Sequence, residues 1–239
     1  SEDEAFEDIR TLTALFADQG FMNEQVEDID LSLFVPEQKV RTYEVHPLVD
    51  AILDKDSEHI ELLSMWAPNM TTILGRLGGA TVGVLANNPA HLAGVLDAAA
   101  GEKAARFVRT CDAFGIPLIV IADVQGFLPG AGQEWEGAVR RGAKLLHAFG
   151  ESVVPRVTLI TRRAYGGAYV AMNSKSLGAT RVFAWPEAEV SVMGAVAAVR
   201  VLHRRLLADI PSEQRESMEL ELAAEHEKVS GGVVKAIEI

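Results

Sequence analysis

Cysteine is almost absent from this sequence, because its 239 residues include a single one, Cys111. One thiol cannot close a disulfide within the chain, and no cysteine cluster exists to hold zinc or an iron–sulfur centre. The six histidines are scattered, without a pair at metal-ligand spacing. We therefore expect no metal site and a reducing, cytoplasmic setting.

Positive charge and long apolar runs are also scarce. The chain has 22 Lys and Arg against 34 Asp and Glu, which gives a formal net charge of −12. Such a surface repels phosphate backbones, so nucleic acid is not an expected partner. No run approaches the roughly 18 uninterrupted apolar residues that a membrane-spanning helix needs. The sequence begins at Ser1 without an initiator Met, a basic segment or an apolar segment, which indicates a cut or processed end rather than a signal peptide.

Hydrophobic residues make up 49% of the chain, so it carries enough apolar material for a packed core and is not expected to be disordered. The first thirty residues differ from the rest, because they hold ten acidic residues and one basic residue. Within them Phe6, Ile9, Leu12 and Phe16 recur at helical spacing. We predict a helix followed by an irregular acidic stretch, and we assign residues 1–42 to a linker.

From Tyr43 onward the pattern is that of an α/β domain, which we place at residues 43–239. The β-rich runs 71–77 and 80–86 flank Gly78 and Gly79, which is the signature of a hairpin. Helical and strand-like segments then alternate, which predicts a sheet covered by helices. The other predicted elements are helices at 46–53, 104–115, 135–149, about 170–177, 195–208 and 212–229, and strands at 118–122, 156–161, 180–184 and 189–192.

Two glycine-rich segments, 126–132 and 166–168, each follow a buried strand at the point where the chain turns into a helix. Small residues there let a ligand approach backbone N–H groups, and a helix N-terminus adds unpaired donors with partial positive charge. Two adjacent amides aimed at one oxygen form an oxyanion hole, which needs no particular side chain. The alternative is that these glycines only permit tight turns, and spacing alone does not decide between the two.

Side-chain signatures of familiar chemistry are missing, since neither a nucleophile elbow nor a P-loop nor a dinucleotide fingerprint is present. The arginine pairs 140–141, 162–163 and 204–205 could meet an anion, but on an acidic protein we expect them to be ion-paired surface residues. Tyr165 and Tyr169 flank the second glycine-rich segment and are the expected walls of a pocket.

Six longer motifs occur in a fixed order along the chain. They are Gly83-Val-Leu-Ala-Asn-Asn-Pro, Glu102-Lys-Ala-Ala-Arg-Phe-Val-Arg-Thr-Cys-Asp-Ala-Phe, Asp123-Val-Gln-Gly-Phe-Leu-Pro-Gly, Arg141-Gly-Ala-Lys-Leu-Leu, Ala164-Tyr-Gly-Gly-Ala-Tyr and Val192-Met-Gly-Ala. Together they closely resemble the carboxyltransferase β subunits of biotin-dependent acyl-CoA carboxylases of the acetyl- and propionyl-CoA type. The resemblance runs from about Tyr43 to the end of the chain.

Those β subunits consist of two crotonase-like halves, and this sequence resembles only the C-terminal one. The resemblance implies an α/β fold of the ClpP/crotonase type, a ββα superhelix, and it makes residues 1–42 an interdomain linker. It implies a hexameric ring, a homo-oligomer in which the acyl-CoA-binding N domain of one subunit faces the biotin-binding C domain of another. It also implies biotin as the cofactor, carried as carboxybiotin on a biotinylated α subunit, and acyl-CoA as the substrate.

By the same resemblance, the amides of Gly167 and Ala168 form an oxyanion hole for the ureido oxygen of biotin. Negative charge grows on that oxygen as the carboxyl group leaves, so fixed donors there stabilise the departing biotin. The acyl-CoA enolate is held by the N domain, so this chain carries half of a site. The residues expected to line the biotin pocket come from three segments: Gly126, Phe127, Leu128, Pro129 and Gly130; Tyr165, Gly166 and Tyr169; and Met193, Gly194 and Ala195.

Two positions depart from the pattern of the family. Gln125 stands where many members have Pro, and Val170 stands where many carry Asp after the second Tyr of the motif. Val170 matches the position that resembles the acyl-length selector of the family, so an apolar residue there leaves the acyl chain open. Family members also continue past the strand at which this chain halts, Ile239, which predicts truncation at both ends.

The sequence is therefore interpreted as the biotin-facing half of a carboxyltransferase of fatty acid and lipid metabolism, inactive without its N domain. Two rival interpretations remain. A free-standing crotonase-type hydratase, isomerase or decarboxylase would use the same amides to hold a thioester oxygen, although the sequence lacks a well-placed Glu pair for acid–base work. A non-catalytic assembly subunit would bind neither biotin nor CoA.

Overall fold

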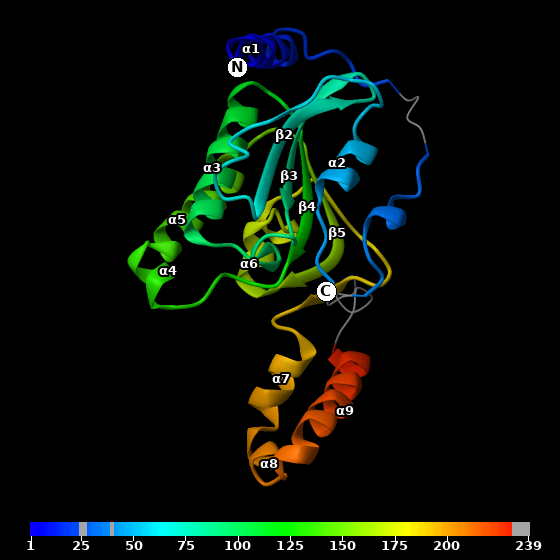
Figure 1. Cartoon of the computed structure of the whole chain (residues 1–239), viewed down its shortest axis with the longest axis vertical. Helices are drawn as coiled ribbons and strands as arrows, with labels where there is room; N and C mark the ends of the chain where they lie inside the picture. Colours follow the sequence, from blue (N-terminus) through cyan, green and yellow to red (C-terminus); the bar gives the residue numbers. More distant parts are fainter. Residues whose placement is uncertain (24–27, 39–40, 231–239) are drawn as a thin grey trace.

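The computed structural model describes residues 1–23, 28–38 and 41–230, and within them the centre is a seven-stranded mixed sheet (Figure 1). The strands are β1 (Ile60–Glu61), β2 (Met70–Leu77), β3 (Ala80–Asn87), β4 (Leu118–Val124), β5 (Arg156–Tyr165), β6 (Arg181–Ala184) and β7 (Glu189–Ser191). They are arranged in the order β1-β2-β3-β4-β5-β6, and β7 pairs with the end of β5. The first three strands are antiparallel, whereas β3 to β6 run parallel.

The predicted hairpin is confirmed. Leu77 on β2 pairs with Ala80 on β3, so Gly78 and Gly79 form a two-residue turn. Both glycines have positive φ, 57° and 82°, which the favoured hairpin turn requires and which side chains oppose. The parallel strands that follow are joined by helical crossovers, as the alternating pattern predicts.

Helices cover both faces of the sheet (Figure 1). One face carries α3 (Ala98–Ala113), α5 (Ala138–Glu151) and α6 (Gly166–Ala171), and the other carries α2 (His46–Ile52) and the short 3-10 helix η1 (Leu31–Phe34). Successive side chains along a strand point to opposite faces of the sheet, so β2, β3 and β4 each contribute residues to both cores. The larger core includes Leu74, Leu85, Phe107, Val120, Leu145, Phe149 and Ile160, and the smaller one includes Leu48, Val49, Ile73, Val84 and Ile121.

Several predicted boundaries are wrong. The helix predicted at 135–149 is α5, which begins later, at Ala138, because Gly137 before it adopts φ 79°, and a short helix, α4 (Ala131–Trp135), lies in front of it where the sequence predicts mostly loop. The helix predicted to end near 177 is α6, which starts earlier at Gly166 and stops at Ala171, followed by the 3-10 helix η3 (Lys175–Leu177).

β5 is four residues longer than the predicted strand 156–161, because its last residues pair with β7. The helix predicted at 195–208 is likewise divided, into α7 (Ala195–Leu202) and α8 (Arg204–Ala208). Hydrophobic periodicity places an element well, but it does not register a change of direction inside one.

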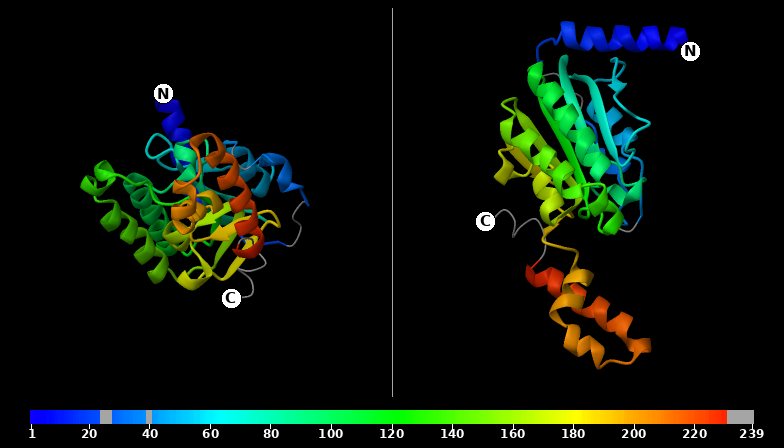
Figure 2. Two further views of the ribbon diagram at one scale, coloured as in Figure 1. Left: turned by 90° about the horizontal axis from the view of Figure 1, so that it is seen from below. Right: turned by 90° about the vertical axis from the view of Figure 1, so that its left-hand side faces the viewer.

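The N-terminal helix α1 (Glu2–Ala17) confirms the helix predicted from spacing, and Ser1 and Glu4 form a capping box at its start. It lies at one end of the molecule, where its Leu15 is buried in the larger core. At the opposite end α7, α8 and α9 (Ser212–Ser230) form a helical arm with a small core of its own, Val199, Leu207 and Ala223 (Figure 2). In the part of the chain that the structure describes, no helix is long and apolar enough to cross a membrane.

Three ionisable side chains, Lys103, Glu61 and His46, lie in a row at the edge of the sheet formed by β1. Lys103 on α3 is fully buried, and its Nζ atom has no hydrogen-bond partner among the described residues. Its carboxylate neighbour is Glu61, with Oε1 at 3.9 Å. The other oxygen of Glu61 lies 3.0 Å from His46 Nε2 on α2. These three ionisable side chains therefore connect α3 and α2, which cover opposite faces of the sheet. Burial lowers the pKa of Lys103, and the Glu61 charge opposes that shift.

Replacing Lys103 with methionine is expected to raise the free energy of unfolding by roughly 1–2 kcal/mol, because a poorly compensated buried ammonium gives way to an apolar chain of similar shape. Glu61 keeps its contact with His46 in that variant. Urea unfolding measures the difference. The matched control is Lys144→Met, which removes an exposed lysine from a Glu102 pair at 2.7 Å and is expected to change stability by less than about 0.5 kcal/mol. A clear loss of stability in Lys103→Met would show that the ammonium has partners that stabilise it.

Candidate active site

The three segments predicted to line a pocket meet at the carboxyl ends of β4 and β5. Phe127, after β4, forms a parallel bridge to Leu96, and its ring edge lies beside two glycines. A Cβ atom on Gly142 of α5 would lie 3.1 Å from the ring, and a Cβ on Gly167 of α6 would lie 3.9 Å from it. The Phe127 ring therefore lies beside the start of α6, and of the two glycines only Gly142 is at a distance where a side chain would crowd the ring.

The third segment, 192–195, lies against the turn from β5 into α6. Gly166 has φ 56°, and a Cβ atom there would stand 2.8 Å from the carbonyl oxygen of Val192. A Cβ on Gly194 would lie 3.4 Å from the ring of Tyr165. Segments separated by about 25 residues thus touch at two glycines, and the Gly166 contact leaves no room for a Cβ atom, whereas a Cβ on Gly194 would make an ordinary van der Waals contact.

Tyr165 is the last residue of β5 and is nearly buried, with 8% of its surface exposed. Its hydroxyl donates a hydrogen bond to Glu189 at the start of β7. Burial, together with the Glu189 carboxylate, raises the pKa of Tyr165 above its usual value, so the phenol stays protonated and remains a donor. Ser191 Oγ donates a hydrogen bond to the carbonyl oxygen of Met193 at 2.6 Å, which fixes the turn after β7.

Helix α6 begins with Gly166, and no side chain caps its N-terminus. The first amides of any helix lack a partner within it, and those of Gly167 and Ala168 belong to this group. Ala168 is fully buried, and its carbonyl accepts a bond from Met172. The start of α6 thus leaves two adjacent backbone donors without a partner inside the helix.

The remaining predicted residues lie on the loop that follows β4 and on α6. Gly126 and Gly130 have positive φ, 150° and 128°, with open space where a Cβ would project. Leu128 donates its amide to Leu96 at 2.7 Å, which holds the loop between them, and Pro129 is exposed. On α6, Tyr169 packs partly buried against the larger core, while Val170 is 39% exposed.

Sequence reasoning missed a cluster beneath these segments. Asp123 on β4 is fully buried and accepts from Arg162 Nε at 2.7 Å and from Arg163 Nε at 3.1 Å. The expectation that the 162–163 pair lies on the surface is therefore wrong, since Arg162 is only 4% exposed. Adjacent arginines on a strand normally point to opposite faces, so the sequence carries no signal that both would reach one carboxylate.

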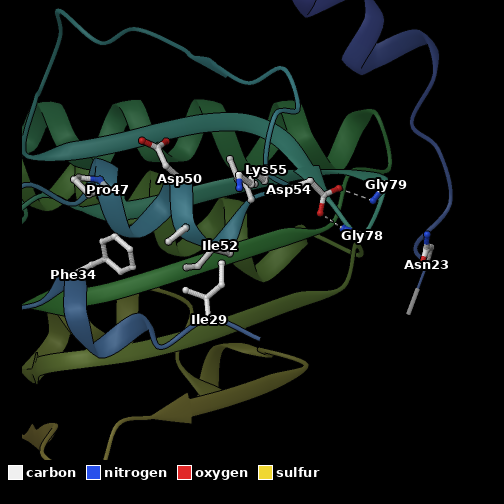
Figure 3. A pocket seen from close by; sticks show the side chains of 12 residues that line it. Asn23, Ile29, Phe34, Pro47, Asp50, Ile52, Asp54, Lys55, Gly78 and Gly79 are labelled. Carbon is white, nitrogen blue, oxygen red and sulfur yellow. Dashed lines mark hydrogen bonds between the residues drawn. The ribbon is translucent and has the colours of Figure 1, made fainter. Parts of the chain in front are cut away.

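Elsewhere in the structure a pocket of about 850 Å³ lies between α2, the side chains of Ile29 and Phe34, and the β2–β3 turn (Figure 3). Asp54 at its rim accepts from the amides of Gly78 and Gly79 at 2.7 Å each. None of the predicted site residues lines this pocket, and the Asp54 carboxylate is already bound by the turn. Among the described residues, no group of three or more His, Cys, Asp and Glu side chains is arranged to hold a metal ion.

A twisted sheet with helical crossovers, and a glycine-rich turn that presents backbone amides at its carboxyl edge, define a crotonase-like α/β protein. The family comparison is more specific: the carboxyl transferase domain matches residues 1–239, and the chain belongs to that family. It is 57% identical to the biotin-dependent acetyl-/propionyl-coenzyme A carboxylase beta6 subunit of Mycobacterium tuberculosis, over 99% of this chain and 50% of that protein.

Two further relatives agree. The propionyl-CoA carboxylase beta chain of Rhodococcus erythropolis is 52% identical over 97% of this chain and 50% of its own length. The solved structure of transcarboxylase 12S, described as a hexamer with methylmalonyl-coenzyme A bound, superposes with a TM-score of 0.85 at 35% identity over 97% of this chain and 45% of that one. The chain thus spans about half the length of the curated relatives that it matches.

Proposed function

We propose that this chain is the biotin-facing half of the carboxyltransferase of an acyl-CoA carboxylase. The complete protein transfers the carboxyl group from carboxybiotin to the α carbon of an acyl-CoA. The observation that supports this proposal is the pair of backbone amides at Gly167 and Ala168, set beside the Phe127 ring at the start of α6. The names of the curated relatives, which are biotin-dependent carboxylase subunits, agree with it.

The residues around α6 fit a ureido ring. An amide pair suits an oxygen that gains negative charge, and the absence of a Cβ at Gly167 leaves the donors open to a flat group lying against Phe127. Carboxybiotin, carried on a biotinylated partner subunit, supplies the carboxyl group. The Gly167 and Ala168 amides donate to the ureido oxygen as that charge grows, and Tyr165, whose ring lies beside Gly194, forms another wall of the pocket.

The acyl-CoA side of the reaction belongs to an N domain outside this chain, which is held in place across a homo-oligomer such as a hexameric ring. In this arrangement residues 1–42 are the linker between the two halves, residues 43–239 are the biotin-binding domain, and the enzyme works in the cytoplasm. Val170, which follows Tyr169 on α6, contributes to the choice of acyl chain. Apolar side chains exposed on the helical arm agree with burial in an assembly: Val201, Leu202, Leu206 and Leu220.

Calorimetric titration of the 239-residue chain with biotin and, separately, with propionyl-CoA tests the proposal. We expect binding of biotin and no binding of the CoA ester, because the chain carries the biotin-facing half alone. The Ala168→Pro variant, which removes one amide donor, is expected to weaken biotin binding, and Ala168→Ser is the matched control that keeps the donor. Binding of propionyl-CoA without biotin would support a free-standing crotonase-type enzyme, and binding of neither would support an assembly subunit.

The same chain is expected to form no carboxylated product with a biotinylated carrier protein and acyl-CoA. Holding two reactants together supplies much of the rate of such a reaction, and half of the site cannot do so. Product formation is measured by fixation of labelled carbon. Steady turnover by the chain alone would contradict the assignment of the acyl-CoA half to another domain.

A further inference from the structure

We propose that the ion pair of Asp123 with Arg163 is a positioning element that sets the spacing between the two glycine-rich segments of the site. The inference rests on the proposed function, because it assigns these residues to carboxyl transfer. Neither side chain is placed against the reacting atoms. Their role is to hold the backbone from which the donors and the aromatic wall project.

The pairing of β4 with β5 shows how both arginines reach one carboxylate. Ala122 pairs with Ile160, and Val124 pairs with Ala164, so one residue on β4 faces three on β5. This irregularity breaks the alternation of faces and turns Arg162 and Arg163 toward Asp123. Bulges of this kind often occur beside active sites, where they redirect side chains.

The two partners occupy equivalent places relative to the site. Asp123 lies three residues before Gly126, where the loop that carries Phe127 begins. Arg163 lies three residues before Gly166, where the amide-bearing turn begins. The hydrogen bond of 3.1 Å from Arg163 Nε to Asp123 Oδ1 therefore connects the strand ends from which the two glycine-rich segments start. A change in its length moves Phe127 relative to the Gly167 amide.

The ion pair of Asp123 with Arg163 is shielded from water. The Asp123 carboxylate is fully buried, and the Arg163 side chain is 11% exposed. Charge-assisted hydrogen bonds in such surroundings are strong, and without Arg163 the Oδ1 atom of the buried Asp123 loses its partner, while Oδ2 keeps the bond from Arg162. The positions of the two strand ends are therefore coupled.

Arg162 has a different role, although it shares the carboxylate. Its Nη1 atom donates to the carbonyl of Arg41 at 2.7 Å, and its guanidinium lies 4.6 Å from the centre of the Tyr43 ring. Tyr43 also contacts Thr161 through their hydroxyl groups at 3.4 Å. Arg162 thus fastens the end of the linker to β5, while Arg163 acts on the site.

The test compares Arg163→Met with Arg156→Met. Arg156 is a buried arginine at the other end of the same strand, where it binds the carbonyls of Phe149 and Gly178, so it controls for the loss of any buried guanidinium. Arg163→Lys keeps a charge without the planar fork and is expected to recover part of the effect.

Hydrogen exchange on the 239-residue chain is the first readout, and it does not depend on any enzymatic activity. In Arg163→Met we expect roughly tenfold faster exchange at the Leu128 and Met172 amides, which close the two segments onto Leu96 and Ala168, with smaller changes in β2 and β3. Arg156→Met is expected to leave those two amides unchanged. Equal acceleration throughout the sheet, or no change at Leu128 and Met172, would overturn the proposal.

Kinetics of the complete enzyme provide the second readout. We expect kcat of Arg163→Met to fall by roughly 100-fold, the effect of a displacement of about 1 Å, while the KM for acyl-CoA stays within about twofold. Arg156→Met is expected to keep its kcat. A parent enzyme without carboxyl transfer would refute the proposed function and leave the exchange result standing, whereas an active Arg163→Met would refute the positioning role alone.

Discussion

Replacing Ala168 with proline is expected to reduce carboxyl transfer by the complete enzyme by roughly 100- to 1,000-fold, which corresponds to about 2.7–4 kcal/mol. Proline has no N–H group, so one of the two donors that would face the ureido oxygen is removed. Because Ala168 lies in the first turn of α6, where the N–H group has no acceptor within the helix, its loss breaks no helical hydrogen bond and the helix can survive the change. The rate is measured by transfer of labelled carboxyl to acyl-CoA.

Ala168→Ser is the control for this experiment, since it keeps the backbone donor and adds one hydroxyl at a buried position. We expect a mild loss of rate, within about tenfold, that reflects crowding rather than a missing donor. Melting temperature and assembly of both variants must equal those of the parent for the comparison to count. A well-folded proline variant with most of its transfer activity would mean that the backbone amides do not carry the reaction and that the glycines serve as a tight turn.

Replacing Gly166 with alanine is expected to destabilise the protein by roughly 2–5 kcal/mol. Part of this cost, about 1–2 kcal/mol, arises because a side chain at φ 56° is strained. The rest, about 1–3 kcal/mol, arises because the new Cβ would stand 2.8 Å from the backbone oxygen of Val192, a contact that no side-chain rotation relieves. The segment 192–195 must then move away from the start of α6, so carboxyl transfer is expected to fall as well.

Gly115→Ala separates the two contributions. Gly115 has a comparable φ of 71°, but nothing lies within 4 Å of the position its Cβ would take. We expect this variant to lose about 1–2 kcal/mol of stability, from backbone strain alone, and to retain its activity. Urea denaturation of both variants gives the comparison. Equal losses would show that the close approach of Val192 has no energetic weight.

Much of the architecture follows from local pattern. The double glycine between two β-rich runs predicts the hairpin of β2 and β3, and the continuous apolar run at 118–122 predicts a strand buried on both faces. The acidic start with helically spaced apolar residues predicts α1. The order of motifs identifies the family, which the domain match confirms. The inferences about the hairpin, the strand and the helix hold because they depend on residues close together in the chain, whose conformational preferences follow from their side chains.

The roles proposed for Gly167, Ala168 and their neighbours remain predictions, but the proximity of the three segments is a fact of the tertiary structure. Periodicity cannot show that Val192 touches Gly166, because that contact depends on how β7 pairs with the extended end of β5. It also started the helix of 135–149 before Gly137, where a left-handed residue separates α5 from the short helix α4.

The buried cluster of Asp123, Arg162 and Arg163 separates most clearly what the sequence determines from what the tertiary structure decides. The sequence by itself determined the elements, their order and the glycine-rich turns, all of which are local properties. It did not determine that Arg162 and Arg163 both bind Asp123, because neighbouring strand residues point to opposite faces unless the pairing register shifts. That shift arises between strands separated by more than 30 residues, so only the tertiary structure decided which charges are buried beneath the site.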